Sequence, residues 1–170
     1  ERGPRGFTMA EAARRAGVSV AAPYKHFADR EALLVALAQV GYQEQERRFV
    51  AAVAGAGAPG RQLAAAAEAY VDFALESSAL FDVVYNSGMD KATHPELGDA
   101  ARHMLDVLLK PAADVAGEGA EELLVSVAVL AHGYATFLLA GTLGPVPDVV
   151  PDIKRRLRHA VVALVDASPP

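Results

Sequence analysis

The sequence predicts an all-α protein, and three features of the chain lead to that prediction. Apolar residues make up 52% of it, which indicates a folded core rather than a disordered chain. Alanine-rich and leucine-rich segments favour helices, and their apolar residues recur at helical spacing. No stretch shows the sustained alternation of apolar and polar residues that is typical of a strand. Cysteine is absent, so disulfides and thiolate metal sites are excluded.

The first complete helix is predicted from a capping pattern near the N-terminus. The Thr8 hydroxyl can accept a hydrogen bond from the amide of Glu11, whose side chain can reach back to the amide of Thr8. A short helix is therefore expected to about Ala16. Gly17 ends it, because glycine adopts the left-handed conformation at little cost.

Two more helices are predicted before the first linker. Ser19 can cap a short helix that reaches about His26. Pro23 lies early in that helix, so it removes one backbone hydrogen bond and is expected to tighten or bend the first turn. Asp29 can cap a third helix that runs to about Ala54 and carries apolar residues at helical spacing, namely Leu33, Leu34, Leu37 and Val40.

Glycine and proline residues mark the predicted linkers and helix ends in the rest of the chain. Residues 55–60 spell G-x-G-x-x-G, but a dinucleotide site needs this motif after a strand and within a βαβ unit, so we interpret them as a linker. Pro111 is expected to end or kink the helix that starts near Pro95. The helices predicted after the linker cover residues 61–76, 79–87, 95–109, 119–143 and 149–167.

The last two predicted helices differ in character. Residues 123–147 contain no Asp, Glu, Lys or Arg, and by length alone they could cross a membrane. Polar and helix-breaking residues interrupt them and no basic cluster flanks them closely, so we prefer a core or subunit interface to a membrane span. The final helix is amphipathic, which suits pairing with another helix, and its apolar face holds Ile153, Leu157, Val161 and Leu164.

The segment Thr8–Leu37 contains the most informative pattern. Two short helices joined at a glycine can place one helix against a DNA backbone and the other in the major groove, although a generic helical hairpin has the same spacing. Residues 1–30 carry three more basic than acidic side chains, whereas the whole chain has a net charge of −5. A basic head on an acidic body suits local DNA contact. The distinctive residues are Thr8, the A-x-x-A-G-V-S of Ala13–Ser19, Tyr24, His26, Phe27 and the E-A-L-L of Glu31–Leu34.

These residues resemble the helix-turn-helix of TetR-family transcriptional regulators. The resemblance implies a homodimer that places its recognition helices in successive major grooves of a palindromic operator. It also implies a C-terminal domain that lowers operator affinity when a ligand binds, which favours repression. We therefore expect a DNA-binding domain over residues 1–45 and a helical effector-binding and dimerisation domain over residues 46–170. The family has a full helix before this motif, so the resemblance implies that residues 1–7 are the tail of a helix that is truncated in this sequence. The sequence also departs from the family pattern at Val20, Pro23 and Arg30.

Contacts to double-stranded operator DNA are expected from both short helices. Thr8 sits at a helix N-terminus, where its hydroxyl and nearby amides can bind phosphate. Lys25 is the strongest groove candidate, with either a phosphate or a guanine edge as its target. Tyr24 fits a phosphate contact and core packing equally well. The full set of expected DNA-binding residues is Thr8, Ser19, Ala21, Ala22, Tyr24, Lys25, His26 and Arg30.

The C-terminal part also resembles a known domain. Tyr70–Tyr85 resembles the start of the C-terminal domain named for a WHG motif in some TetR-like regulators, and His132 with Gly133 would end that motif. The tryptophan is missing, because the chain contains none. This resemblance implies that the last two helices form a four-helix dimer interface.

Aromatic and methionine side chains on several of these helices fit a pocket for a largely apolar effector, and they fit a well-packed core as well. His132 can hydrogen-bond a ligand from inside the bundle, or it can be a satisfied core histidine. The expected ligand-binding residues are Phe73, Phe81, Tyr85, Met104, His132, Thr136 and Phe137.

The sequence contains no nucleophile elbow, P-loop or zinc-protease motif, and its five histidines lack metal-binding spacing. We therefore expect neither enzymatic activity, nor a cofactor, nor a bound metal. An all-α enzyme remains an alternative, as does a dimerising protein without sequence-specific DNA binding. The absence of cysteine and of a secretory signal fits a cytoplasmic protein.

Overall fold

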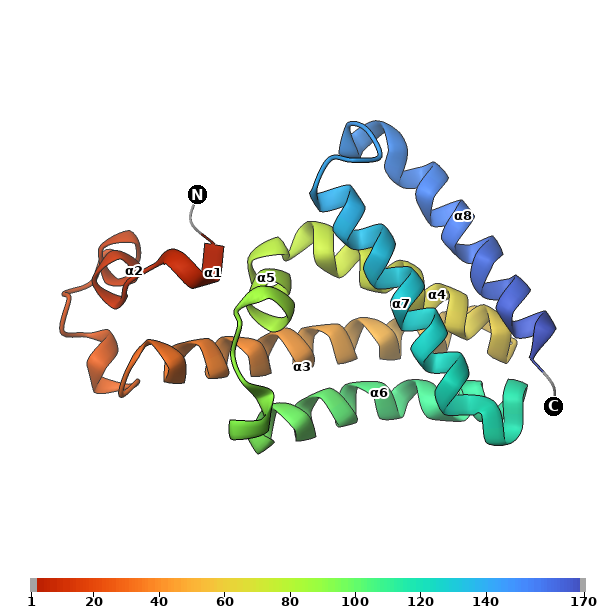
Figure 1. Cartoon of the computed structure of the whole chain (residues 1–170), viewed down its shortest axis with the longest axis horizontal. Helices are drawn as coiled ribbons and strands as arrows, with labels where there is room; N and C mark the ends of the chain where they lie inside the picture. The colour runs from red at the N-terminus through yellow and green to blue at the C-terminus, as the bar shows by residue number, and fades with distance from the viewer. Residues whose placement is uncertain (1–2, 169–170) are drawn as a thin grey trace. The chain divides into compact units, whose positions relative to one another are not determined.

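The computed structural model describes residues 3–168, and every regular element among them is helical (Figure 1). The all-α prediction is therefore confirmed. Three of the elements are short 3-10 helices: η1 (Pro23–Lys25), η2 (Lys91–Thr93) and η3 (Gly117–Gly119). The α-helices are α1 (Gly3–Gly6), α2 (Met9–Arg15), α3 (Arg30–Ala56), α4 (Pro59–Glu76), α5 (Ser78–Asn86), α6 (Pro95–Ala116), α7 (Ala120–Leu139) and α8 (Val146–Ala167).

The capping pattern that predicted α2 is present. The amide of Glu11 donates to Thr8 Oγ1 at 3.2 Å, so Thr8 is the N-cap. Gly17 has a φ of +70°, the left-handed conformation expected of the residue that ends this helix. On its inner face, α2 buries Met9 and Ala13.

The predicted helix from Ser19 to His26 is wrong in its details. Residues 19–22 form a turn, in which the amide of Ala22 donates to the carbonyl of Ser19 at 2.9 Å, and only η1 follows it. Pro23 has no amide hydrogen, so it cannot donate the bond to the Ser19 carbonyl that a regular α-helix requires. The expected tightening at Pro23 therefore replaces the α-helix with a 3-10 turn.

The linker after α3 is shorter than predicted. The capping bond runs from the amide of Ala32 to Asp29 Oδ1 at 2.8 Å, and α3 then continues to Ala56. Gly57, with a φ of +77°, makes the turn. Gly60 already lies inside α4, and a Cβ there would come within 2.8 Å of Val165 on α8. The G-x-G-x-x-G pattern thus serves a turn and a close helix crossing.

Pro111 neither ends nor bounds α6, which continues to Ala116. The expected end of the helix at Pro111 is therefore wrong, and the alternative of a kink stays a prediction. Leu108, Ala112 and Ala116 are all buried, so packing on both sides of the proline offsets the backbone bond that it cannot make. The next helix, α7, ends at Leu139, four residues earlier than expected, before Gly141 in the left-handed conformation.

The chain divides into two compact units. The first unit contains the residues up to Gln43 together with Ala79–Ala101. Its core includes Leu34, Phe81 and Leu97, and a Cβ on Gly41 of α3 would come within 2.5 Å of Val84 on α5. Helices α3 and α5 therefore approach each other closely at this glycine.

The second unit contains Glu44–Ser78 and the residues from Arg102 onward. Its helices α4, α7 and α8 pack against one another. Leu157 and Val161, on the apolar face of α8, are fully buried. That face does pair with other helices, as predicted, but the partners belong to the same chain. Ion pairs from Lys154 to Asp72 at 2.7 Å and from Arg158 to Glu68 at 2.6 Å also connect α8 to α4.

One helical stretch among the described residues, Pro95–Leu139, is long and apolar enough by length and composition alone to cross a membrane, and 33% of its most apolar window is buried. Composition alone does not distinguish such a stretch from a core helix.

Candidate DNA-binding and effector sites

The segment between α2 and α3 exposes side chains that would ordinarily be buried. Val18, Val20 and Tyr24 are 47%, 48% and 55% exposed. Lys25 and His26 are exposed beside them. Large apolar side chains gathered on one short turn, next to a cation, indicate a contact surface. The predicted contact residues Ser19 and Ala21 are exposed on the same segment, and Ala22 is half-buried.

Thr8 is exposed at the N-terminus of α2. Its hydroxyl oxygen already accepts the capping hydrogen bond from Glu11. The hydroxyl hydrogen and the first amides of α2 remain the groups with which this end of the helix could bind phosphate.

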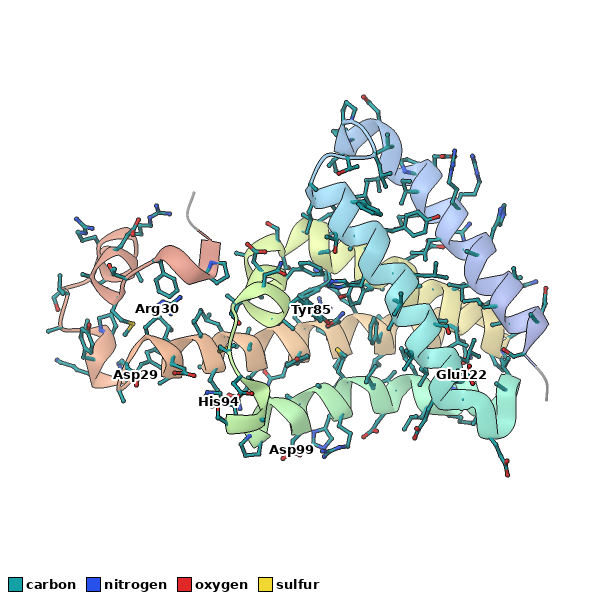
Figure 2. All side chains as sticks on the ribbon, in the orientation of Figure 1. Asp29, Arg30, Tyr85, His94, Asp99 and Glu122 are labelled. Atoms are coloured by element: carbon teal, nitrogen blue, oxygen red, sulfur yellow. The ribbon has the colours of Figure 1, made fainter. Side chains whose placement is uncertain are left out.

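Arg30 differs from the other predicted contact residues, because its side chain contacts other residues of the N-terminal head, residues 1–30. Its guanidinium donates to the carbonyl of Pro4 and lies 5.1 Å from the centre of the Phe7 ring. Figure 2 labels Arg30 at the start of α3, on the side that faces the N-terminal residues. Sequence reasoning assigned Arg30 to the DNA backbone, a contact that stays a prediction; in the structure this residue connects α3 to α1.

His132, a predicted effector residue of the second unit, forms a part-buried polar pair with Tyr70. Tyr70 Oη and His132 Nδ1 are 2.7 Å apart, and Tyr70 is only 7% exposed. Burial lowers the pKa of His132 below its ordinary value of 6.5, which favours the neutral ring. Phe73 and Met104 are buried in the same unit. A polar pair of this kind can orient a ligand, or its two groups can satisfy each other.

Two predicted effector residues belong to the first unit. Phe81 is 1% exposed, and the centre of its ring lies 4.9 Å from that of Tyr85, one turn along α5. The seven predicted ligand-binding residues are therefore divided between the two units.

Thr136 and Phe137 are on the exposed face of α7. The Thr136 hydroxyl donates to the carbonyl of His132 at 2.7 Å, and Phe137 is 54% exposed. Val125 and Val129, at 63% and 67% exposed, continue the same helix surface toward the N-terminus of α7. This apolar surface is better suited to contact another chain than to line an internal pocket.

A groove of about 520 Å³ runs along α4. None of the predicted effector residues lines it. The groove is lined by alanines of α3 and α4 together with the two ion pairs between α4 and α8, and Arg61 and Val162 complete it.

Sequence reasoning missed a half-buried arginine in the second unit. Arg48 pairs with Glu44 at 2.7 Å and Glu76 at 2.8 Å, and its guanidinium carbon lies 5.9 Å from the centre of the Phe73 ring. Hydrogen bonds from Arg47 and then Arg48 lower the pKa of Glu44 to about 2. The E-x-x-R-R spacing could have predicted the local pairs, but not the pair with Glu76 of another helix.

Metal ligands do not gather anywhere in the part of the chain that the structure describes. No group of three or more His, Cys, Asp or Glu residues there could hold a metal ion.

Two family models match separate parts of the chain. Residues 1–37 match the model of bacterial regulatory proteins of the tetR family, and residues 63–164 match the tetracyclin repressor-like C-terminal domain. A solved structure, described as a protein with unknown function from Rhodococcus sp. RHA1, is 30% identical with a TM-score of 0.72. The match covers 91% of this chain and 84% of that one. No curated protein matches the chain.

Proposed function

The chain belongs to the tetR family of bacterial regulatory proteins, and from that premise we propose that it is a ligand-responsive repressor acting as a homodimer on a palindromic operator. The chain is a DNA-binding transcriptional regulator. The observation that carries the finer proposal is the exposed Val18–His26 segment, which combines apolar groups, hydroxyls and a lysine on one short turn. Such a set can read thymine methyl groups, phosphates and base edges.

The homodimer is proposed to form through α7. Val125, Val129 and Phe137 are more than half exposed although all three are apolar. A second copy related by a two-fold axis would cover the same face on both chains. Two copies of the head would then be presented to two half-sites, as a palindromic operator requires.

The effector is proposed to be a largely apolar molecule that binds in the second unit near His132. A neutral imidazole supplies one donor and one acceptor. The hydrogen bond with Tyr70 fixes the orientation of the His132 ring. Buried Phe73 and Met104 supply apolar surroundings in the same unit. No cofactor or membrane is part of this proposal, and the regulator would act in the cytoplasm.

The experiment that tests the proposed function is selection of duplexes from a random library by the full-length protein. Enrichment of a palindrome, followed by its displacement when a library of apolar small molecules is screened, would support the repressor. If duplexes bind without enrichment of any sequence, the protein is a dimerising protein without operator specificity. Turnover of a small molecule that persists in a Lys25→Ala, Tyr24→Ala variant would instead favour the all-α enzyme.

A further inference from the structure

His94 has a carboxylate facing each of its two ring nitrogens. Nε2 lies 3.0 Å from Glu31 Oε1, and Nδ1 lies 3.4 Å from Glu96 Oε1. Glu31 is in the first turn of α3, whereas Glu96 is in the first turn of α6. Figure 2 shows the labelled His94 between these two helices. All three residues belong to the first unit, and the His94 side chain is only 20% exposed.

The protonation state of His94 decides how many of these contacts are attractive. Only the imidazolium can donate from both nitrogens, because a neutral ring presents a lone pair on one of them. The hydrogen bond with Glu31 raises the pKa of His94 above 6.5, although partial burial opposes it, and the charges of Glu96 and Glu31 add to the rise. Among the side chains that the structure describes, these two carboxylates are the charges that shift the His94 pKa.

The His94 contacts join the starts of two helices that connect the units. Helices α3 and α6 both begin in the first unit and end in the second. Only two residues separate Asp29, which caps α3, from the exposed Val18–His26 segment. The position of the first turn of α3 therefore fixes where the DNA-reading segment is attached.

We propose that His94 is a proton-dependent link between α3 and α6 that holds the DNA-reading head in its binding arrangement. The inference rests on the proposed function, because it concerns regulation of the same DNA-binding site. The protonated ring donates a hydrogen bond to the carboxylate at the start of each helix. In the neutral ring, one nitrogen carries a lone pair instead, and this lone pair faces a carboxylate without a hydrogen bond. If the head is less ordered before it binds, it loses more conformational freedom when it binds DNA, and this loss weakens binding. Operator affinity therefore falls as the pH rises through the pKa of His94.

The link itself is tested without DNA. NMR titration of the ring nitrogens in the full-length protein should give a His94 pKa above 6.5, and Glu31→Gln should lower it. His103→Gln, an exposed histidine on the same helix, should leave the titration of His94 unchanged. A His94 pKa at or below 6.5, or one that Glu31→Gln does not change, would overturn the link.

The effect on DNA is tested with a duplex obtained in the selection experiment, at constant ionic strength from pH 5.5 to 8.5. His26 is replaced by Gln in every sample, because it is a histidine in the predicted contact surface. Kd should rise with pH by about tenfold for each unit by which the His94 pKa differs between free and bound protein. His94→Gln should remove this rise, while His103→Gln should keep it.

An equal pH dependence in the His94→Gln variant would overturn the regulatory role. Circular dichroism confirms that each variant is folded before it is compared. Failure to select any duplex would refute the proposed function instead, and the ring titration would still decide whether the link exists.

Discussion

At the scale of single residues, Lys25 and Tyr24 distinguish a DNA-reading surface from a packed hairpin. Both are exposed, and Tyr24 at 55% does not serve a core in this chain. Lys25→Ala and Tyr24→Ala should each weaken operator binding by about 1–3 kcal/mol while helical content stays unchanged. Electrophoretic mobility shift measures the affinity. Lys110→Ala, an exposed lysine of α6 outside the head, is the control.

The pattern of loss separates two roles for Lys25. A base-edge contact predicts a loss concentrated at one operator position. A phosphate contact predicts an even loss across operator variants and a shallower dependence on salt. Full affinity in both variants would contradict the assignment of residues 19–26 to the major groove.

His132 makes a second residue-scale prediction, on stability. Its folded-state pKa lies below 6.5, so below that pH the unfolded chain binds more protons than the folded one. Folding stability should therefore be complete above pH 6.5 and fall as the pH drops toward the folded-state pKa. Urea unfolding from pH 7.5 to 5 should show this fall in the wild type and a smaller one in His132→Gln. His159→Gln, at an exposed position on α8, is the matched control.

His94 acts on stability in the opposite direction. Its pKa is raised, so its stabilising contribution is complete below pH 6.5 and is lost as the pH rises through the folded-state value. His94→Gln should reduce the loss of folding stability at alkaline pH. It should not change the loss at acidic pH, which is assigned to His132. An acidic fall of equal size in wild type and His132→Gln would contradict the assignment to that residue.

At the scale of elements, the sequence predicts helices well where a local signal decides them. Thr8, Asp29 and Gly17 act through bonds or backbone angles within a few residues, and each boundary that they predict is close to the observed one. The predicted helix end at Pro111 is wrong, because the helix continues there with buried neighbours on the same face. Tertiary packing of this kind leaves no local pattern.

Helix crossings give an element-scale prediction with a matched control. Gly41→Ala places a Cβ within 2.5 Å of Val84 on α5, so it should destabilise the protein by about 1–3 kcal/mol through overpacking. Gly98→Ala, in α6, meets nothing within 4 Å. It should stabilise the protein by about 0.5–1 kcal/mol, because alanine is the better helix former. Thermal unfolding measures both changes, and two changes of the same sign would refute the close α3–α5 crossing.

At the scale of the whole molecule, the fold class was predictable but the sites were only partly so. The exposed segment that is proposed to contact DNA spans only a few residues, so its pattern was visible in the sequence. Tyr70 and His132 are 62 residues apart, and Glu31 and His94 are 63 apart. Pairs of this kind depend on which helix faces meet in space, which no single-sequence periodicity specifies. The sequence likewise did not predict which face of α7 is exposed, because that helix is apolar nearly all round.

This exposed face leads to the prediction that concerns the whole assembly. If a second copy covers it, Val125→Asp with Val129→Asp should place two uncompensated charges in the interface and give monomers. Both valines are more than 60% exposed in the single chain, so the variant should keep its helical content. Leu157→Asp is different, because Leu157 is fully buried within the chain and its replacement should unfold the protein. Sedimentation velocity distinguishes the outcomes.

A specific dimer should bury more than about 1,000 Å² in total. Val50→Asp is the matched control, because Val50 is 51% exposed and apolar but lies on α3, so this variant should remain dimeric. The monomeric variant should also lose operator affinity by a large factor, since one head can occupy only one half-site and the second contact is no longer intramolecular. A folded double variant that still sediments as a dimer would exclude this face of α7 from the interface. A monomer with undiminished affinity would show that one copy is enough to bind the operator.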